Sequence, residues 1–270
     1  MELIFDEKAD RMYKAWCNSP QGRAFDKSIE QLVTFLVNPR PGERLLDIGC
    51  GRGNHLLLFS RLSLDLNGTD ASPYMIQMAG NRLGHLCTLK TGRAEDLPFD
   101  DNEFDVAVLI NTLEFLDNPL EALIEAGRVT KRKVFIGIIN GLSWCGLVKK
   151  ATGYFGDPVF SRATFYNLFQ IKSLLKEAYG PVPVSWGCIR TCPALIEQIA
   201  PFAKKAFDWK SFPFASFLGI SATMVPRMRA DGLPLKVRLK RAGQSLMRPG
   251  TLENMKRNKG VHGDETGIHV

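Results

Sequence analysis

The stretch that decides the fold is Leu45-Leu46-Asp47-Ile48-Gly49-Cys50-Gly51-Arg52-Gly53, where an apolar run contains an acid and leads into three alternate glycines. The apolar run predicts a buried strand, and the glycines predict a sharp turn into a helix. Because glycine has no Cβ, the backbone of such a turn can come within contact distance of a ligand. The stretch therefore predicts a strand–turn–helix unit of an α/β domain, with an extended cofactor lying across the strand ends.

The acid in this motif indicates which cofactor the turn holds. Dinucleotide sites use G-x-G-x-x-G and place a pyrophosphate on the helix N-terminus, where a preceding carboxylate would repel it. S-adenosylmethionine (SAM) carries a sulfonium cation and an ammonium group, which Asp47 helps to hold. The spacing G-x-G-x-G, with Asp47 two residues before Gly49, therefore favours SAM over a nicotinamide cofactor.

A second acid, Asp70, stands 21 residues after Gly49 and is followed by Ala71. It directly follows residues 64–69, which we expect to form the second strand. A carboxylate at this place can accept hydrogen bonds from both ribose hydroxyls, as it does in dinucleotide folds. Two acids and a glycine turn at this spacing predict a nucleoside-containing cofactor far more specifically than any one of them does.

Apolar runs alternate with amphipathic stretches from about residue 44 to about residue 188, which is the pattern of repeated strand–helix units. The sequence predicts a Rossmann-like α/β fold with a seven-stranded, mostly parallel sheet and helices on both faces. Strands are expected at residues 44–48, 64–69, 86–91, 104–110, 133–139, 182–188 and 214–224. Helices are expected at residues 7–37, 54–61, 73–83, 118–129, 165–178 and 193–207. Ser72 is expected to be the N-cap of the third of these helices, with Pro73 in its first turn.

The chain is expected to have three parts. Residues 1–40 form an N-terminal helical cover, and residues 41–226 form the SAM-binding domain, with aromatic lid insertions at 141–164 and 190–213. Residues 227–270 form a basic, loosely ordered tail, because apolar periodicity fades there. The tail holds ten Lys and Arg against four Asp and Glu, in a chain of net charge +7. Such a tail can make weak contact with an anionic surface, although a charged run is usually only solvated.

The glycine turn and three later segments resemble the class I SAM-dependent methyltransferases of the methyltransferase type 11 domain family, which includes ubiquinone and menaquinone biosynthesis C-methyltransferases. Gly92-Arg93-Ala94-Glu95-Asp96-Leu97-Pro98-Phe99 is similar to the family's G-D-A-x-x-L-P-F segment. Residues 104–108 resemble the family's fourth strand, and residues 113–119 resemble the turn and helix after it. The resemblance covers about residues 5–225 and implies transfer of a methyl group from SAM.

Two positions depart from the family pattern. The family's adenine-binding acid is Arg93 here, so the resemblance leaves recognition of the adenine amine to Glu95, Asp96 or the main chain. Many members carry a histidine where this chain has Phe115, and the most obvious general base is therefore missing. Motif and resemblance together give the following expected cofactor contacts: Asp47, Gly49, Cys50, Gly51, Gly53, Asp70, Ala71, Arg93, Ala94, Glu95 and Asn111.

Methyl transfer from a sulfonium is an in-line displacement with a good leaving group, so positioning can supply much of the catalysis. A base is needed only when the acceptor must lose a proton. The sequence assigns no catalytic residue; Tyr13, His55 and Glu114 are weak candidates, and a helical histidine more often packs than catalyses. A SAM-binding regulator or assembly protein without catalysis is the alternative function.

The aromatic insertions favour a small-molecule acceptor that is apolar or aromatic, although the same rings can fill a second core. The segment Asn111-Thr112-Leu113-Glu114 lacks the Asn/Asp-Pro-Pro-aromatic pattern, so amino methylation of DNA or RNA is not expected. Six scattered cysteines without metal-ligand spacing, and no evident secretory signal, predict reduced thiols, no metal and a cytoplasmic protein. The sequence indicates neither the acceptor atom nor an oligomeric state.

Overall fold

The computed structural model describes residues 14–15, 17–143, 163–189 and 213–225. By its internal contacts the chain divides into Met1–Arg227 and Met228–Val270, and the second unit lies outside the described residues. The expected extra helix at 193–207, residues 144–162 of the first insertion and almost all of the second also lie outside them. No helix within the described part is both long and apolar enough to cross a membrane.

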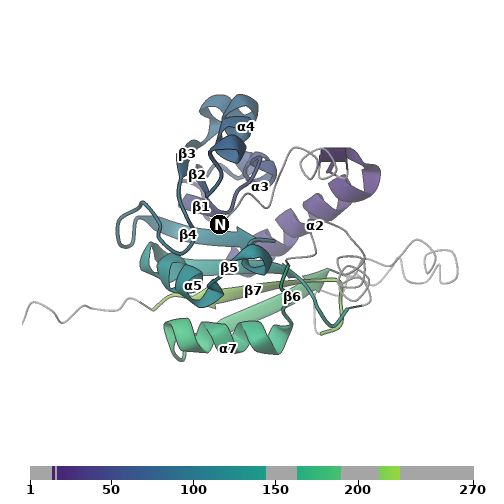
Figure 1. Cartoon of the computed structure of the whole chain (residues 1–270), viewed down its shortest axis with the longest axis vertical. Coiled ribbons are helices and arrows are strands. Elements are labelled where there is room, and N and C mark those ends of the chain that lie inside the picture. The colour runs from purple at the N-terminus through teal and green to yellow at the C-terminus, as the bar shows by residue number, and fades with distance from the viewer. Residues whose placement is uncertain (1–13, 16, 144–162, 190–212, 226–270) are drawn as a thin grey trace, which may run out of the picture. The chain divides into compact units, whose positions relative to one another are not determined.

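Seven strands form one sheet in the order β3-β2-β1-β4-β5-β7-β6 (Figure 1). Strand β7 is antiparallel to both of its neighbours, and the other pairs are parallel. The predicted mostly parallel, seven-stranded sheet is therefore confirmed. The strands are β1 (Arg44–Ile48), β2 (Asp65–Asp70), β3 (Thr88–Thr91), β4 (Phe104–Ile110), β5 (Thr130–Ile139), β6 (Val184–Ile189) and β7 (Phe217–Thr223).

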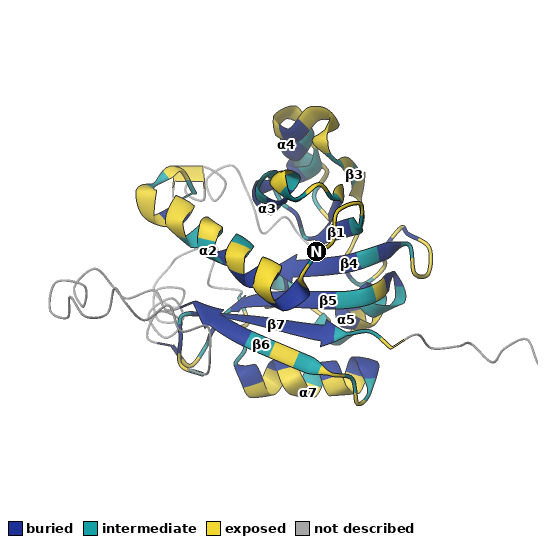
Figure 2. Cartoon of the chain, turned by 180° about the vertical axis from the view of Figure 1, so that it is seen from behind, coloured by how far each residue is buried: buried dark blue, intermediate teal, exposed yellow. Residues whose placement is uncertain are grey.

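Helices cover both faces of the sheet, and each face has its own hydrophobic core. Helices α5 (Pro119–Arg128) and α7 (Leu168–Tyr179) lie over one face. The other face carries α2 (Pro20–Val37), α3 (Asn54–Phe59) and α4 (Pro73–Leu83), and Figure 2 shows the exposed stripe of α2 there. Three short 3-10 turns complete the described elements: η1 (Ser60–Leu62), η2 (Gly84–Leu86) and η3 (Leu113–Phe115).

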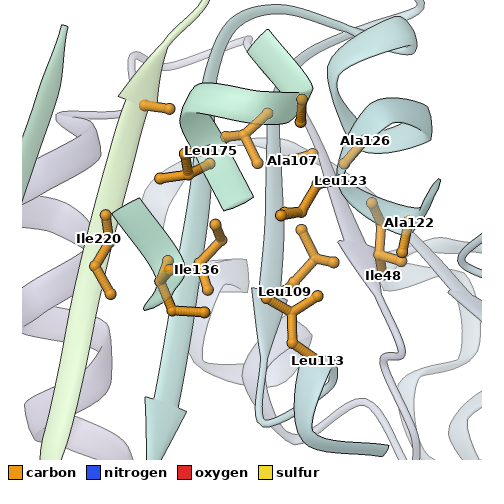
Figure 3. Packing of buried hydrophobic residues seen from close by; sticks show 14 of the residues in the cluster. Ile48, Ala107, Leu109, Leu113, Ala122, Leu123, Ala126, Ile136, Leu175 and Ile220 are labelled. Carbon is orange, nitrogen blue, oxygen red and sulfur yellow. The ribbon is translucent and has the colours of Figure 1, made fainter. Parts of the chain in front are cut away.

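Strand β4 shows why these apolar runs demand two cores. Ala107 and Leu109 pack with α5 and α7, as Figure 3 shows, whereas Val106, Val108 and Ile110 belong to the core on the opposite face. Because side chains alternate along a strand, a strand that is apolar at every position must be covered on both sides. This is the arrangement that the sequence predicts.

The expected front helix over residues 7–37 is wrong in its extent, because the described part breaks at Ser19. Proline at position 20 disfavours a helical conformation in the residue before it, and Ser19 is extended, with ψ of 155°. The Ser19 hydroxyl then accepts a hydrogen bond from the Gly22 N–H at 3.0 Å, which caps α2. The last helix likewise begins at Leu168 instead of residue 165, since Asn167 and Gln170 form a capping box there.

Most other element ends differ from the prediction by one to three residues. Strand β3 begins at Thr88 instead of residue 86 because Gly84–Leu86 form the turn η2. Strand β5 begins three residues earlier than expected, at Thr130. These shifts leave the carboxyl ends of β1 and β4 where the sequence predicts them, at Ile48 and Ile110.

Candidate cofactor site at the strand ends

The site lies where the sheet changes direction, between β1 and β4. From β1 the chain moves outward to β2 and β3, and it then returns to β4 on the other side of β1. Open α/β sheets bind ligands at such a point, outside the carboxyl ends of the strands. Asp47, Asp70 and Asn111 all stand at these ends.

The three glycines of the turn adopt positive φ angles, of 75° at Gly49, 50° at Gly51 and 73° at Gly53. A Cβ at Gly49 would lie 2.5 Å from the Thr112 methyl carbon, so this glycine lets the loop after β4 approach. A Cβ at Gly51 would meet nothing within 4 Å. Gly51 therefore leaves open space beside the strand ends, as a cofactor requires.

Gly53 and Cys50 turn toward the protein interior. A Cβ at Gly53 would lie 2.3 Å from a methyl carbon of Leu83 in α4, so this glycine serves helix packing. The Cys50 thiol is buried, and burial raises its pKa. A cofactor contact at Cys50, as predicted, would therefore come from its backbone.

Asp47 is the most unusual group of the site. It is 1% exposed, and neither carboxylate oxygen has a hydrogen-bond partner among the described residues. Burial, followed by the neighbouring Asp70 carboxylate, raises the pKa of Asp47 to about 8. Burial of an ionised acid without a partner costs free energy, and a positively charged ligand would compensate the charge. Asp47 is therefore a candidate ligand-binding group.

Asp70 is held by backbone groups on both sides. One oxygen accepts a hydrogen bond from the Gly51 N–H at 2.9 Å, and the other accepts one from the Ser72 N–H at 2.9 Å. Burial raises the pKa of Asp70, and these two hydrogen bonds oppose the rise. Since a carboxylate has about four acceptor positions, Asp70 can still accept further hydroxyl groups. Ala71 lies exposed beside it.

The segment after β3 carries a second buried acid. The Glu95 side chain is 6% exposed, and its oxygens lack hydrogen bonds within the described residues. The Arg93 guanidinium lies 3.5 Å from one of these oxygens but is itself 46% exposed, and Ala94 between them is buried. The acid of this segment is thus present two residues later than in the family pattern.

Two residues of α5 hold this segment in place. The Leu97 N–H donates to the Glu125 carboxylate at 3.0 Å, and the Leu97 carbonyl accepts a hydrogen bond from Arg128 at 3.1 Å. At the start of the segment, the Gly92 N–H donates to the Asp70 carbonyl at 3.0 Å. The position of Glu95 is therefore fixed relative to the end of β2.

Asn111 follows β4 in a left-handed conformation, with φ of 54°. Its N–H donates to the Gly137 carbonyl at 2.8 Å, whereas its side-chain oxygen is buried without a hydrogen bond in the described structure. Backbone strain of this kind is often found at functional sites. The geometry is compatible with the predicted contact between Asn111 and a ligand.

The weak catalytic candidates have different places. Glu114 is 1% exposed, and one of its oxygens accepts a hydrogen bond from the Ile139 N–H at 2.8 Å, which ties η3 to the end of β5. His55 is buried in α3, where burial lowers its pKa to about 4 and keeps the imidazole neutral. Tyr13 lies outside the described residues, as does its neighbour Trp16.

Sequence reasoning missed two residues at this edge of the sheet. Thr112 contacts Gly49 and donates its hydroxyl to the Ile48 carbonyl at 2.9 Å. Tyr166 is half-buried, and burial, followed by the nearby Glu114, raises its pKa. Neither residue belongs to a motif, so only the spatial arrangement reveals them. Within the described residues, no group of three or more His, Cys, Asp or Glu could hold a metal ion.

Comparison with known proteins places this geometry among characterised folds. Residues 46–137 match the family model described as a methyltransferase domain. An uncharacterized protein of Methanocaldococcus jannaschii is 33% identical over 180 residues, which cover 64% of this chain and 79% of that protein. An uncharacterized methyltransferase of Mycobacterium tuberculosis is 28% identical over 167 residues, covering 60% of this chain and 65% of the relative.

A solved structure has the same fold. The crystal structure of a SAM-dependent methyltransferase from Thermotoga maritima superposes with a TM-score of 0.63 at 21% identity. The match covers 83% of this chain and 100% of the other. The order of the strands and the two-sided helical cover are thus those of a known architecture.

Proposed function

Because this chain belongs to the family of SAM-dependent methyltransferases, we propose that it transfers the methyl group of SAM to a small-molecule acceptor. The proposed reaction is an in-line displacement in which catalysis comes mainly from positioning. The observation that carries the proposal is the glycine turn with open space at Gly51 between two acids, Asp47 and Asp70. The family membership supports catalysis and gives no support to a non-catalytic regulator.

The three buried or partly buried acids of the site fit the chemistry of SAM. Asp47 offers a negative charge for the positively charged groups, and Asp70 offers acceptors for the ribose hydroxyls. Glu95 offers an acceptor for the adenine amine. When bound, SAM supplies a methyl group on a positively charged sulfur that is already a good leaving group. The residues of this chain would then bind and orient it and exclude water.

The two described candidate bases support catalysis by positioning. His55 is buried in α3 and neutral, with its pKa lowered to about 4 by burial, so it has little capacity to take up a proton. Glu114 uses one carboxylate oxygen to hold the end of β5. We propose an apolar or aromatic acceptor that needs no strong base, bound by the aromatic insertions.

The test is incubation of the purified chain with isotopically labelled SAM and a metabolite extract, followed by mass spectrometry. Small molecules that gain one labelled methyl group are the expected result. Label recovered only in macromolecules would contradict the small-molecule acceptor, and label transferred to nothing would contradict catalysis itself.

Asp70→Ala is expected to weaken SAM binding by about 1.5–3 kcal/mol, or about 10- to 150-fold, because two charge-assisted hydrogen bonds are lost. Calorimetric titration with SAM measures the change. Asp65→Ala is the matched control: Asp65 lies at the other end of the same strand, in an exposed ion pair with Arg44. An exposed ion pair of this kind contributes little to the stability of the fold. Equal affinities of the two variants would contradict the ribose assignment.

Glu95→Gln is expected to lower the ratio of the affinities for adenine and hypoxanthine by about tenfold or more. The reason is that a glutamine can donate to the carbonyl that hypoxanthine has in place of the amine. The measurement compares the binding of S-adenosylhomocysteine with that of S-inosylhomocysteine. Arg93→Gln, two residues away and largely exposed, should leave the preference intact. An unchanged preference in Glu95→Gln would assign adenine recognition to another group.

The two ends of the chain have roles outside the cofactor site. We propose that residues 1–40 cover the site and that the tail after residue 226 is dispensable for the fold, with weak affinity for anionic surfaces. Cys17, Cys50, Cys87 and Cys188 form no disulfide bond within the described part of the chain. They support a reducing, cytoplasmic environment.

A further inference from the structure

Strands β1 and β4 stop pairing with each other just before the glycine turn. The register between them runs from Leu45 to Asp47 of β1 and ends before Ile48. On the other side, β1 stays paired with β2 as far as Ile48. At the start of the turn, the backbone is therefore supported by a neighbouring strand on the β2 side and by none on the β4 side.

The side chain of Thr112 takes the place of this strand pairing. The chain turns at Asn111, directly after β4, in a left-handed conformation. The buried Thr112 hydroxyl then donates to the Ile48 carbonyl at 2.9 Å, with the Ile110 carbonyl as a longer second acceptor at 3.3 Å. The Thr112 methyl carbon closes the contact, because it lies 2.5 Å from the place that a Cβ of Gly49 would take.

The β2 side of the turn is held by other groups. The Gly49 N–H donates to the Thr69 carbonyl at 2.8 Å, which is a contact between backbone groups. The Gly51 N–H donates at 2.9 Å to the carboxylate of Asp70, a proposed cofactor ligand. Thr112 differs from both, because it supports the turn through a side chain that is not a proposed cofactor contact. Its substitution can therefore change the position of the turn while the proposed contacts stay in the chain.

We propose that Thr112 is a positioning residue for the cofactor: its hydroxyl fixes the glycine turn to the end of β4 and holds the turn in its SAM-binding position. This inference rests on the proposed function, since it takes the glycine turn as the SAM site. Thr112 acts through the turn, by way of Ile48 and Gly49. A misplacement of about 1 Å can cost about 100-fold in rate. The hydrogen bond of Thr112 therefore affects ligand binding as well as folding.

Two substitutions separate the hydroxyl of Thr112 from its methyl group. Thr112→Val keeps the branched shape and removes the hydrogen bond to Ile48. It is expected to weaken the binding of SAM and of S-adenosylhomocysteine by about tenfold, which is the scale of one hydrogen bond. Thr112→Ser keeps the hydroxyl and should bind both ligands within about threefold of the wild type. Calorimetric titration of the full chain, well below the Tm of each variant, measures these affinities.

Tyr179→Phe is the matched control for a loss of stability without a change at the turn. The buried Tyr179 hydroxyl donates to the Leu123 carbonyl at 2.6 Å, where the last residue of α7 packs against α5. The substitution thus removes the same kind of buried hydrogen bond, from a hydroxyl to a backbone carbonyl. Both Tyr179→Phe and Thr112→Val should lower the Tm, but the affinity for SAM should fall in Thr112→Val alone.

Amide hydrogen exchange of the ligand-free protein tests the position of the turn without any ligand. The N–H groups of Gly49 and Cys50 donate to the Thr69 carbonyl and are protected in the folded state. Their exchange should be about tenfold faster in Thr112→Val than in the wild type, because the turn has lost its support on the β4 side. Thr112→Ser should keep the wild-type exchange. Equal exchange in both variants would contradict a role of the hydroxyl in holding the turn.

The binding experiments separate this inference from the proposed function. Wild-type affinity in Thr112→Val would overturn the positioning role while the cofactor site stands. Equal losses of affinity in Thr112→Val and Thr112→Ser would assign the effect to the methyl contact and overturn the role of the hydroxyl. An equal loss in Tyr179→Phe would show a general effect of stability, which also overturns it. Absence of saturable SAM binding by the wild-type chain would overturn the proposed function and this inference with it.

Discussion

Asp47→Asn should raise the free energy of unfolding of the ligand-free protein at pH 8 by on the order of 3 kcal/mol, or about 6–12 °C in Tm. The pKa of Asp47 rises from 3.8 in a model peptide to about 8 in the folded chain. Folding therefore requires either uptake of a proton or burial of a charge, and asparagine requires neither. The gain is smaller than the full linkage energy because the buried amide also lacks hydrogen bonds.

The effect of Asp47→Asn on the free energy of unfolding depends on pH. A carboxyl group whose pKa is raised by folding stabilises the protein fully below pH 4, and that contribution is lost as pH rises toward 8. The advantage of Asp47→Asn should therefore be smallest at pH 4 and largest at pH 8. Thermal unfolding of both proteins across this range measures it. A constant difference at all pH values would show that Asp47 does not titrate as its surroundings demand.

Gly51→Val is expected to reduce the affinity for SAM by more than about 100-fold, because the new side chain fills the open space beside the strand ends. Some loss of stability will accompany it, since valine is strained at a φ of 50° by about 1–3 kcal/mol. The ligand affinity of the folded fraction, measured by calorimetry well below the Tm, separates the two effects.

Gly84→Val provides the matched control for this variant. Gly84 has a φ of 54°, and a Cβ there also meets nothing within 4 Å. It is the C-cap residue of α4, so valine introduces backbone strain away from the glycine turn. A loss of stability in both variants with a loss of affinity only at Gly51 would support the site. Equal affinities of the two variants would remove Gly51 from it.

The parts of the fold that depend on local sequence patterns could be predicted from the sequence. Strands β1 and β4 begin and end as expected because each is a mostly apolar run with a polar or glycine boundary. The Ser72–Pro73 start of α4 followed from capping chemistry alone. The mostly parallel character of the sheet followed from the alternation of strands and helices together with the family resemblance, whereas the order of its strands comes from the structure.

The features that the sequence did not predict depend on contacts between residues far apart in the chain. The close approach of Gly49 to Thr112 spans 63 positions of the sequence, and no local signal marks it. The role of Gly53 in packing against Leu83 is likewise a property of two helices in space. The buried position of Glu95 beside Arg93 could be named only as an alternative, because burial depends on how α5 holds the segment.

The contact between Gly49 and Thr112 has a consequence for the entropy of ligand binding. The Thr112 hydroxyl also donates to the Ile48 carbonyl, so the loops after β1 and β4 are locked together at their base. Asp70 is fixed to the same turn through the Gly51 N–H. The backbone at these strand ends is therefore ordered during folding, and ligand binding does not have to order it. Preorganisation of this kind leaves more of the interaction energy for affinity and orientation.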